Sequence, residues 1–305
     1  MDLSRRLKPS QLHLAVKIAE TGKLQSACAA LAISQPAASR MLAEVERLAG
    51  VPLFQRQPKG MVPTPVGEAF ARHARQILSG FDSLEAEMRN LNAGYVGDVR
   101  IGSVTGPAVG SLVPAIQQVR HVAPNIQVTI EVGPSTQLVR GLEEGRFDFV
   151  IARVPPGHDS RDFDITPARV EVVSLMVRAD HPWVGRGRVR LADLADCEWV
   201  MQESGSPIRQ TLEAAFLAAG LTVPRRITNS SSLIVALAVL EGPDAISPQS
   251  REVVDLLMRR GQGANLAVLD LREDLVVSPY FVMRMPSRPL SPATEQILSE
   301  VFKRL

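Results

Sequence analysis

Cysteine and long apolar stretches are scarce in this sequence. Only two of its 305 residues are cysteines, and Cys28 and Cys197 lie far apart along the chain. One chain therefore has neither a disulfide framework nor a Cys-X-X-Cys metal site. No run approaches the roughly 18 apolar residues that span a bilayer, and no apolar segment follows the basic N-terminus as in a signal peptide. We expect a soluble, cytoplasmic protein without a membrane partner.

Signatures of catalysis are missing as well. No two of the five histidines stand at the spacing of metal ligands. The sequence has neither a P-loop nor a Gly-X-Ser-X-Gly nucleophile turn, and a dinucleotide-binding fingerprint that begins at Gly261 fails at Leu266. We therefore predict that the chain is not an enzyme and requires neither a metal nor a cofactor.

The total charge is small, but it is unevenly distributed. The formal net charge is +2. Residues 1–64 hold nine Lys and Arg against four Asp and Glu, an excess of five positive charges, so residues 65–305 carry a net charge of −3. A basic N-terminal segment is what binding to DNA phosphates requires.

Residues 7–62 have the pattern of a helix-turn-helix followed by a wing. The apolar spacing predicts helices over 10–21 and 24–31, with a turn at 32–33. Ser34 is placed to cap a third helix that runs to about Ala49. A short strand is predicted over 51–54, and 55–62 is predicted as a hairpin with Pro58 and Gly60 at its tip.

The outward side of the third helix is polar at its N-terminal end, where a recognition helix meets base edges. Gln35 suits an adenine edge, and Arg40 suits guanine or phosphate. The serines suit phosphate, and basic wing residues suit the flanking backbone or minor groove. The alternative is a packing motif whose polar face is merely solvated. We predict that the DNA interface consists of Ser34, Gln35, Pro36, Ser39, Arg40, Arg56 and Lys59.

From Thr64 onward the pattern becomes that of one long helix, about 28 residues and ~42 Å in length. Its apolar positions alternate spacings of four and three, as in a coiled-coil seam. This helix is too long to bury its seam against a small winged domain, so we predict homodimerisation through 65–95. Packing against the C-terminal part of the same chain is the alternative. The predicted seam is Phe70, Ala74, Ile77, Phe81, Leu84, Met88 and Leu91.

Residues 96–305 alternate strand-like and helix-like runs, which predicts an α/β domain with mainly parallel sheets. Strands this short fit two lobes better than a single sheet. Because ligands bind outside the carboxyl ends of strands and near helix N-termini, hydroxyl and amide residues at those places are candidates. Residues 133–136 suit a small anion, to which Arg153 would add positive charge, although Ser135 alone would also serve as a helix cap. The predicted effector-binding residues are Ser103, Thr105, Ser135, Thr136, Gln202, Ser204 and Asn229.

The N-terminal segment resembles the winged helix-turn-helix of LysR-type transcriptional regulators, most clearly in SQPAASRMLAEVERLAGVPLFQR at 34–56. The segment KGMVPTPVGEAF at 59–70 is similar to the family's passage into its linker helix, and the resemblance continues through the chain. Pro63 departs from the pattern, although proline is tolerated at a strand end. The resemblance implies a C-terminal domain like that of periplasmic binding proteins. Lobe one would cover about 96–165 and 271–305, lobe two about 166–270, with crossings near 161–169 and 270–275.

The resemblance also implies a DNA-binding transcriptional regulator that responds to a small-molecule effector and controls a catabolic or metabolic operon. Aromatic acids, sulfonates and sugar acids are candidate effectors. Dimers would bind operator DNA and assemble into homotetramers, and RNA polymerase is a further expected partner. The alternative is a solute-binding protein with an N-terminal dimerisation module, which a shallow salt dependence of DNA affinity without sequence preference would favour.

Overall fold

The computed structural model describes residues 6–58, 60–92, 97–259 and 265–305. Contacts divide the chain into two compact units. Met1–Asp98 and Arg140–Phe147 belong to the first unit, and Val99–Val139 and Asp148–Leu305 belong to the second.

Three helices build the core of the first unit: α1 (Pro9–Thr21), α2 (Leu24–Leu31) and α3 (Gln35–Ala49). The predicted bounds are confirmed to within one residue. Apolar side chains from all three helices, among them Leu14, Ala27 and Leu42, pack into one cluster. The turn between α2 and α3 is made by Ala32 in the left-handed region at φ 53°, and the Ile33 N–H donates to the Cys28 carbonyl. The helix-turn-helix is therefore present as predicted.

The wing consists of β1 (Phe54–Gln57) and β2 (Gly60–Pro63), paired antiparallel with Pro63 opposite Phe54 at the end of the ladder. The hairpin is confirmed, but the strand predicted over 51–54 is wrong, because only Phe54 is in a strand. The reason is a side chain. Glu46 Oε1 accepts from the N–H groups of Leu53 and Phe54 at 2.8 and 3.2 Å. These N–H groups therefore bind a side chain of α3 and not the carbonyls of a neighbouring strand.

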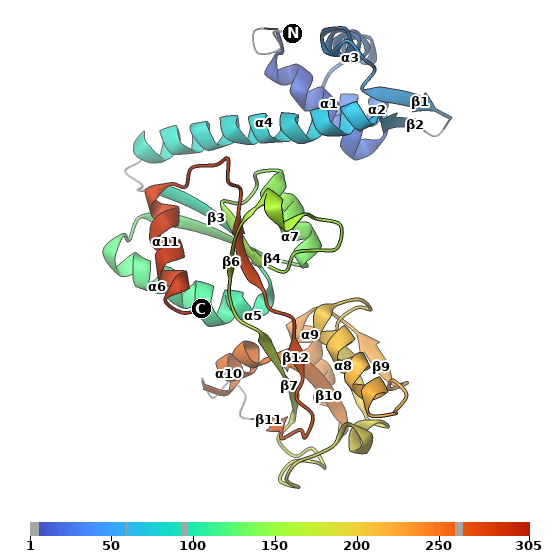
Figure 1. The fold of residues 1–305 in the computed structure, drawn as a ribbon, viewed down its shortest axis with the longest axis vertical. Helices are drawn as coiled ribbons and strands as arrows, with labels where there is room; N and C mark the ends of the chain where they lie inside the picture. The colour runs from blue at the N-terminus through green and yellow to red at the C-terminus, as the bar shows by residue number, and fades with distance from the viewer. Residues whose placement is uncertain (1–5, 59, 93–96, 260–264) are drawn as a thin grey trace. The chain divides into compact units, whose positions relative to one another are not determined.

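The long helix α4 spans Pro65–Asn92, as predicted. Thr64 Oγ1 accepts from the Gly67 N–H at 3.0 Å and caps the first turn. A Cβ on Gly67 would lie 1.9 Å from the Leu53 carbonyl oxygen, so glycine permits this close approach of two backbone segments. In Figure 1, α1 lies against the beginning of α4.

In the second unit, lobe one is built on a five-stranded sheet with the order β4-β3-β5-β13-β6. Helices α6 and α11 pack side by side on it (Figure 1), and their apolar residues share one core with β3, β5 and β13. The predicted helix over 108–121 contains a π-helical turn, because Pro114 has no N–H for the carbonyl of the preceding turn. The elements are β3 (Gly97–Ser103), α5 (Thr105–Pro107), the π turn Ala108–Leu112, α6 (Val113–Val122), β4 (Ile126–Val132), α7 (Ser135–Glu143), β5 (Phe149–Ala152), the 3-10 turn Ser160–Asp162, β6 (Asp164–Pro167), β13 (Phe281–Arg284) and α11 (Pro292–Phe302).

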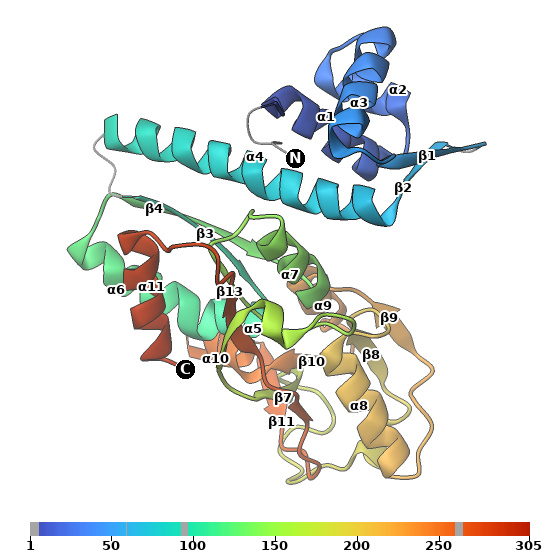
Figure 2. The same ribbon diagram turned by 45° about the horizontal axis from the view of Figure 1, so that its top comes forward.

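Lobe two has a sheet of order β11-β7-β10-β8-β9, with β12 also paired to β7. Helices α8 and α9 flank this sheet (Figure 2). Trp199 on β8 is fully buried and packs edge-on against Phe216, with ring centroids 5.7 Å apart. The elements are β7 (Glu171–Arg178), the 3-10 turn Leu191–Leu194, β8 (Glu198–Met201), α8 (Pro207–Ala218), β9 (Ile227–Asn229), α9 (Leu233–Val239), β10 (Ala245–Ser250), α10 (Arg251–Arg259), β11 (Leu266–Leu269) and β12 (Val276–Val277).

The expectation of mainly parallel sheets is wrong. β7 runs antiparallel to β10, β11 and β12, and β13 runs antiparallel to β5 and β6. The reason is the route of the chain. It leaves lobe one along β6 and β7 and returns along β12 and β13, so the outgoing and returning strands pair as an antiparallel ribbon.

The returning crossing differs from the prediction. The outgoing crossing is 168–170, at the end of the predicted 161–169, and the return is 278–280, later than the predicted 270–275. Lobe one therefore includes all of β6, and lobe two extends to Val277. The polar run 270–275 is a loop of lobe two. There the Arg272 N–H donates to the Val189 carbonyl at 2.9 Å, and Glu273 accepts from the Leu191 N–H.

Candidate nucleic-acid interface and effector site

The predicted DNA-reading residues lie on the outer face of α3. Ser34 is the N-cap, and its Oγ accepts from the Ala37 N–H at 3.4 Å. Gln35, Pro36 and Arg40 are exposed and Ser39 is half-buried. The opposite side of α3, with Ala38, Leu42 and Val45, is buried. The side chains of Gln35, Ser39 and Arg40 make no hydrogen bond or ion pair with any residue that the structure describes.

Two acidic residues of α3, Glu44 and Glu46, fix its orientation, and no sequence pattern indicates this role. Gln11 is buried in α1, and its Nε2 donates to Glu44 Oε2 at 2.9 Å. Glu46 holds the start of the wing through the two backbone bonds described above. Both carboxylates are thus engaged within the unit. The i to i+2 spacing of two glutamates on one helix does not predict partners 33 or 7 residues away.

The wing is anchored to the end of α1. The Met61 N–H donates to the Gly22 carbonyl at 2.7 Å. A Cβ on Gly60 would lie 2.3 Å from that same carbonyl oxygen, and Gly60 has φ +147°. Arg56 is exposed on β1. Lys59, the other predicted wing contact, lies outside the described residues.

The predicted seam of α4 divides into two parts. Ala74 is fully buried against Leu12 and Val16 of α1, and Phe70 packs on the same cluster. Ala74 is covered by its own chain, so its assignment to an intermolecular seam is wrong, whereas Phe70 is half-buried by the same contacts. The periodicity identified an apolar face but could not tell which partner covers it. Four seam residues remain exposed, by 49, 49, 53 and 58 %: Ile77, Phe81, Leu84 and Met88. The side chain of Leu91 lies outside the described part of the structure.

In lobe one, the predicted effector residues gather at the ends of β3, β4 and β5. The Arg153 N–H, just after β5, donates to Ser135 Oγ at 3.1 Å at the start of α7. Thr136 and Thr105 are exposed. Ser103 is fully buried and its hydroxyl donates to the Val104 carbonyl at 2.9 Å, so it is not available to a ligand in this arrangement.

In lobe two, Arg209 of α8 joins two of the predicted residues. Its Nη1 donates to the Gln202 carbonyl at 3.2 Å and to Asn229 Oδ1 at 2.5 Å, and its Nε donates to Glu213 Oε1 at 2.6 Å. Gln202 and Asn229 follow or end the neighbouring parallel strands β8 and β9. Ser204 is exposed in the loop before α8. Sequence reasoning missed Arg209, although an arginine in the first turn of a helix that follows a strand is a usable signal.

Arg153, which was expected to supply positive charge, is already paired. Its Nη2 lies 2.6 Å from Glu171 Oε2, and its Nε donates to the Ser278 carbonyl at 2.9 Å. The side chains of Arg153 and Glu171 are only 12 and 5 % exposed. Burial raises the pKa of Glu171 above its ordinary value, and the neighbouring guanidinium opposes that rise.

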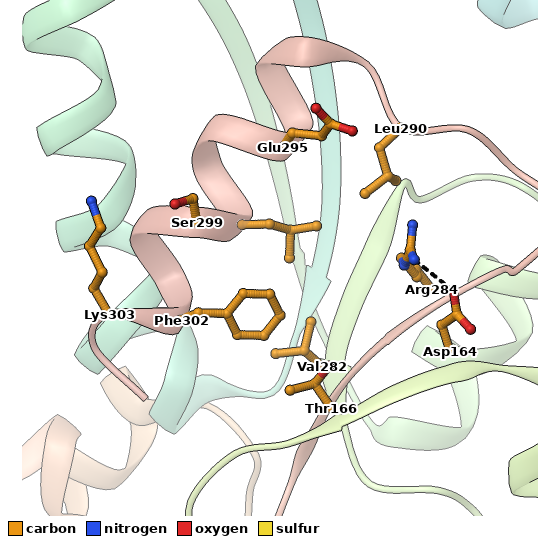
Figure 3. A pocket seen from close by; sticks show the side chains of 10 residues that line it. Asp164, Thr166, Val282, Arg284, Leu290, Glu295, Ser299, Phe302 and Lys303 are labelled. Atoms are coloured by element: carbon orange, nitrogen blue, oxygen red, sulfur yellow. Dashed lines mark ion pairs between the residues drawn. The ribbon is translucent and has the colours of Figure 1, made fainter.

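The groove in Figure 3 lies elsewhere in lobe one, between the β6–β13 edge of the sheet and α11. Val282, Leu298 and Phe302 give it an apolar floor, and Arg284 pairs with Asp164 at 2.7 Å on its rim. None of the predicted effector residues lines it.

No helix among the described residues is long and apolar enough to cross a membrane. No three His, Cys, Asp or Glu side chains among them are grouped so that they could hold a metal ion.

Comparisons with known proteins cover nearly the whole chain. A family model described as the LysR substrate binding domain matches residues 92–305, and one described as a bacterial regulatory helix-turn-helix protein of the lysR family matches residues 9–68. The chain is similar to the HTH-type transcriptional regulator GbpR of Azospirillum brasilense, at 34% identity over 97% of this chain and 86% of that protein. It is also similar to GbpR of Rhizobium radiobacter, at 38% identity over 85% of each protein.

Among solved structures, full-length CbnR complexed with its target DNA has a similar fold. The TM-score is 0.64 at 22% sequence identity, and the match covers 98% of this chain and 100% of CbnR.

Proposed function

Because the chain belongs to the LysR family of DNA-binding transcriptional regulators and carries that family's effector-binding domain, we propose that it senses a small anionic metabolite. Binding of this effector changes the transcription of a catabolic or metabolic operon. The chain acts by binding and not by catalysis, in keeping with relatives that are named as transcriptional regulators.

The exposed face of α3 supports the assignment of operator recognition to the N-terminal unit. Gln35 and Arg40 stand on the solvent side of the helix, and Arg56 stands on the wing. We assign base reading to Gln35 and Arg40, and phosphate contact to the serines and Arg56. The acidic residues of α3 do not oppose this role, because Glu44 and Glu46 are engaged within the unit.

Dimerisation is assigned to the C-terminal half of α4. Ile77, Phe81, Leu84 and Met88 are spaced by four, three and four residues and leave an apolar stripe exposed to solvent. A second copy of the same stripe covers it and brings two recognition helices to two operator half-sites. Two such dimers then form a tetramer on the operator, from which RNA polymerase is contacted.

The effector site is assigned to the polar residues at the strand ends of each lobe, and their clustering within each lobe supports the proposal. Lobe one offers Thr105, Ser135 and Thr136 at the start of α7, where backbone N–H groups favour an acid group. Lobe two offers Gln202 and Asn229, held together by Arg209. The candidates are therefore aromatic acids, sulfonates and sugar acids. The effector shifts the population between arrangements of the dimers and must bind one arrangement more tightly.

A thermal-shift experiment with matched ligand pairs tests the anionic class. Each acid is compared with a neutral analogue of the same shape: benzoate with benzamide, benzenesulfonate with benzenesulfonamide, and gluconate with sorbitol. Since a ligand at 100 times its Kd stabilises a protein by about 2.7 kcal/mol, a binding acid raises the melting temperature by several degrees and its neutral partner does not. Equal stabilisation by both members of a pair would exclude recognition of the negative charge.

A further inference from the structure

The two chain crossings between the lobes are joined to each other and to one arginine. The Ala168 N–H donates to the Tyr280 carbonyl at 3.1 Å, and the Tyr280 N–H donates to the Arg169 carbonyl at 3.2 Å. Arg153 contacts both crossings at their ends. Its Nε donates to the Ser278 carbonyl on the returning segment, and its Nη2 pairs with Glu171, the first residue after the outgoing segment. Any change in the angle between the lobes therefore has to change the contacts of Arg153.

The same residue touches the predicted effector site from its backbone. The Arg153 N–H donates to Ser135 Oγ at the first residue of α7. The Nη1 group of Arg153 makes no hydrogen bond with any described residue. Arg153 thus has one end at the start of α7 and the other end at the junction between the lobes.

The surroundings of Glu171 make this junction sensitive to position. The backbone of Gly106 in lobe one lies directly against it, because a Cβ there would be 2.9 Å from Glu171 Oε1 and 3.4 Å from Glu252 Oε2. Two carboxylates of lobe two, Glu171 and Glu252, therefore lie close to one backbone position of lobe one, and Glu171 pairs with the guanidinium of Arg153. Burial, together with these two glutamates, raises the pKa of the buried Tyr280 to about 12. The electrostatic energy of these charged groups depends strongly on the position of the guanidinium.

We propose that Arg153 is a positioning residue that couples occupancy of the effector site to the arrangement of the two lobes. The coupling runs from Ser135 through the backbone of Arg153 to its side chain, and from there to Glu171, just after the outgoing crossing, and to Ser278 on the returning crossing. The inference rests on the proposed function in one respect, that the effector binds at the start of α7. The junction itself is testable without any ligand.

Hydrogen exchange of the full chain, read by mass spectrometry, tests the junction. In Arg153→Lys the charge remains, but a single ammonium cannot reproduce the fork that reaches both Ser278 and Glu171. The amides of 168–170 and 278–280 should then exchange about tenfold faster than in the wild type. The matched control is Arg284→Lys, since Arg284 pairs with Asp164 inside lobe one. This control should leave exchange at both crossings unchanged. The same rate in Arg153→Lys as in the wild type would overturn the proposal.

A second variant covers the case in which Arg153→Lys fails to fold. Glu171→Gln keeps an oxygen that accepts from Arg153 and removes only the charge, so the crossings should exchange about threefold faster. Unchanged exchange in Glu171→Gln would then overturn the junction.

The coupling has its own readout, which a merely structural arginine would not affect. The acid with the largest thermal shift in the panel above should slow exchange in the wild type both at the start of α7 and at the crossings. In Arg153→Lys, or in Glu171→Gln if the former does not fold, it should slow exchange only at the start of α7. Equal slowing at both places in the variant would refute the coupling. If no acid binds, the anionic class of the proposed function fails, while exchange in the ligand-free variants still decides whether Arg153 holds the junction.

Discussion

The DNA-binding unit and the effector domain hold their positive charge in opposite ways. On α3 and the wing, Arg40 and Arg56 stand in solvent, and the carboxylates of Glu44 and Glu46 are engaged within the unit. In the effector domain, Arg153 and Arg209 are largely covered, and each is paired with a glutamate. A polyanion is attracted over a distance by charge that nothing nearby neutralises. A small ligand is instead selected at short range by groups that are already fixed in place.

The salt dependence of the two binding reactions should show the largest difference. Between 50 and 200 mM salt, operator affinity should fall by about 10³-fold or more, because six or more phosphate contacts release counterions. Effector affinity should change by less than about tenfold over the same range, since buried charges are screened weakly. Fluorescence anisotropy with labelled DNA and thermal shifts with the acid ligand measure the two dependences. Similar slopes for both reactions would remove the proposed distinction.

Loss of the dimer should weaken DNA binding by the first unit and leave effector binding by the second unit unchanged. Ile77→Glu places a charge in the exposed apolar stripe of both chains, and each lost isoleucine contact alone is worth about 1.5–3 kcal/mol when fully buried. The dissociation constant of the dimer should rise by at least about 100-fold, and operator affinity should fall as a result. Sedimentation velocity measures assembly. The control is Val122→Glu, an exposed apolar residue outside α4. A dimer unchanged by Ile77→Glu would place the seam elsewhere.

A single exposed arginine should carry part of the sequence preference. Arg40→Ala should cost about 1–3 kcal/mol at one base position and reduce discrimination there. Arg47→Ala, later on the same helix, should weaken binding to all sequences alike if it affects binding at all. Competition titrations against single-base operator variants separate the two effects. Full discrimination by the Arg40 variant would show that Arg40 contacts only phosphate.

Removing a covered arginine should affect the ligand and not the DNA. Arg209→Met releases Asn229 and the Gln202 carbonyl, so the affinity for the acid ligand should drop about tenfold, the worth of one charge-assisted hydrogen bond. Operator affinity without ligand should stay the same. Arg259→Met is the matched control, because its pair with Asp255 is exposed on α10. Unaltered ligand binding in Arg209→Met would remove lobe two from the proposed site.

The smallest expected effect concerns pH. Because the pKa of Glu171 is raised above its ordinary value of 4.5 in the folded chain, the folded state holds this proton more tightly than the unfolded state does. The free energy of unfolding should therefore fall as pH rises from about 4.5 through the raised value. Arg153 and Glu252 are the charged groups that face Glu171. Urea unfolding of the wild type and Glu171→Gln across this range should show the decline to be shallower in the variant. Equal declines would assign the effect to other groups.

The features that could be predicted from the sequence are those set by residues close to one another along the chain. Helix bounds in the first unit followed from apolar spacing, the cap at Ser34 and the end of α1 at Gly22, all of which act within a few residues. The strand predicted over 51–54 is absent because Glu46, seven residues before Leu53 in the chain, accepts from the N–H of Leu53. Spacing also showed that Phe70 and Ala74 belong to an apolar face, but not that α1 covers them.

The effector domain was harder to predict, because many of its contacts join residues that are far apart in the sequence. The alternation of strands and helices predicted the class of fold, and the strand ends predicted where polar residues gather. The antiparallel crossings, and the partners of Arg153 at positions 171 and 278, depend on contacts that only the folded chain creates. Ser103 occupies the predicted strand end, but its hydroxyl bonds the neighbouring carbonyl and is buried.

A direct comparison of two DNA duplexes tests whether α3 reads an operator. The full chain is titrated at 100 mM salt onto DNA from immediately upstream of its own gene and onto a scrambled duplex of equal length. We predict affinity at least about 10³-fold higher for the upstream duplex, with a change in affinity when the binding acid is added. Equal affinity for the two duplexes, with and without the acid, would contradict the account.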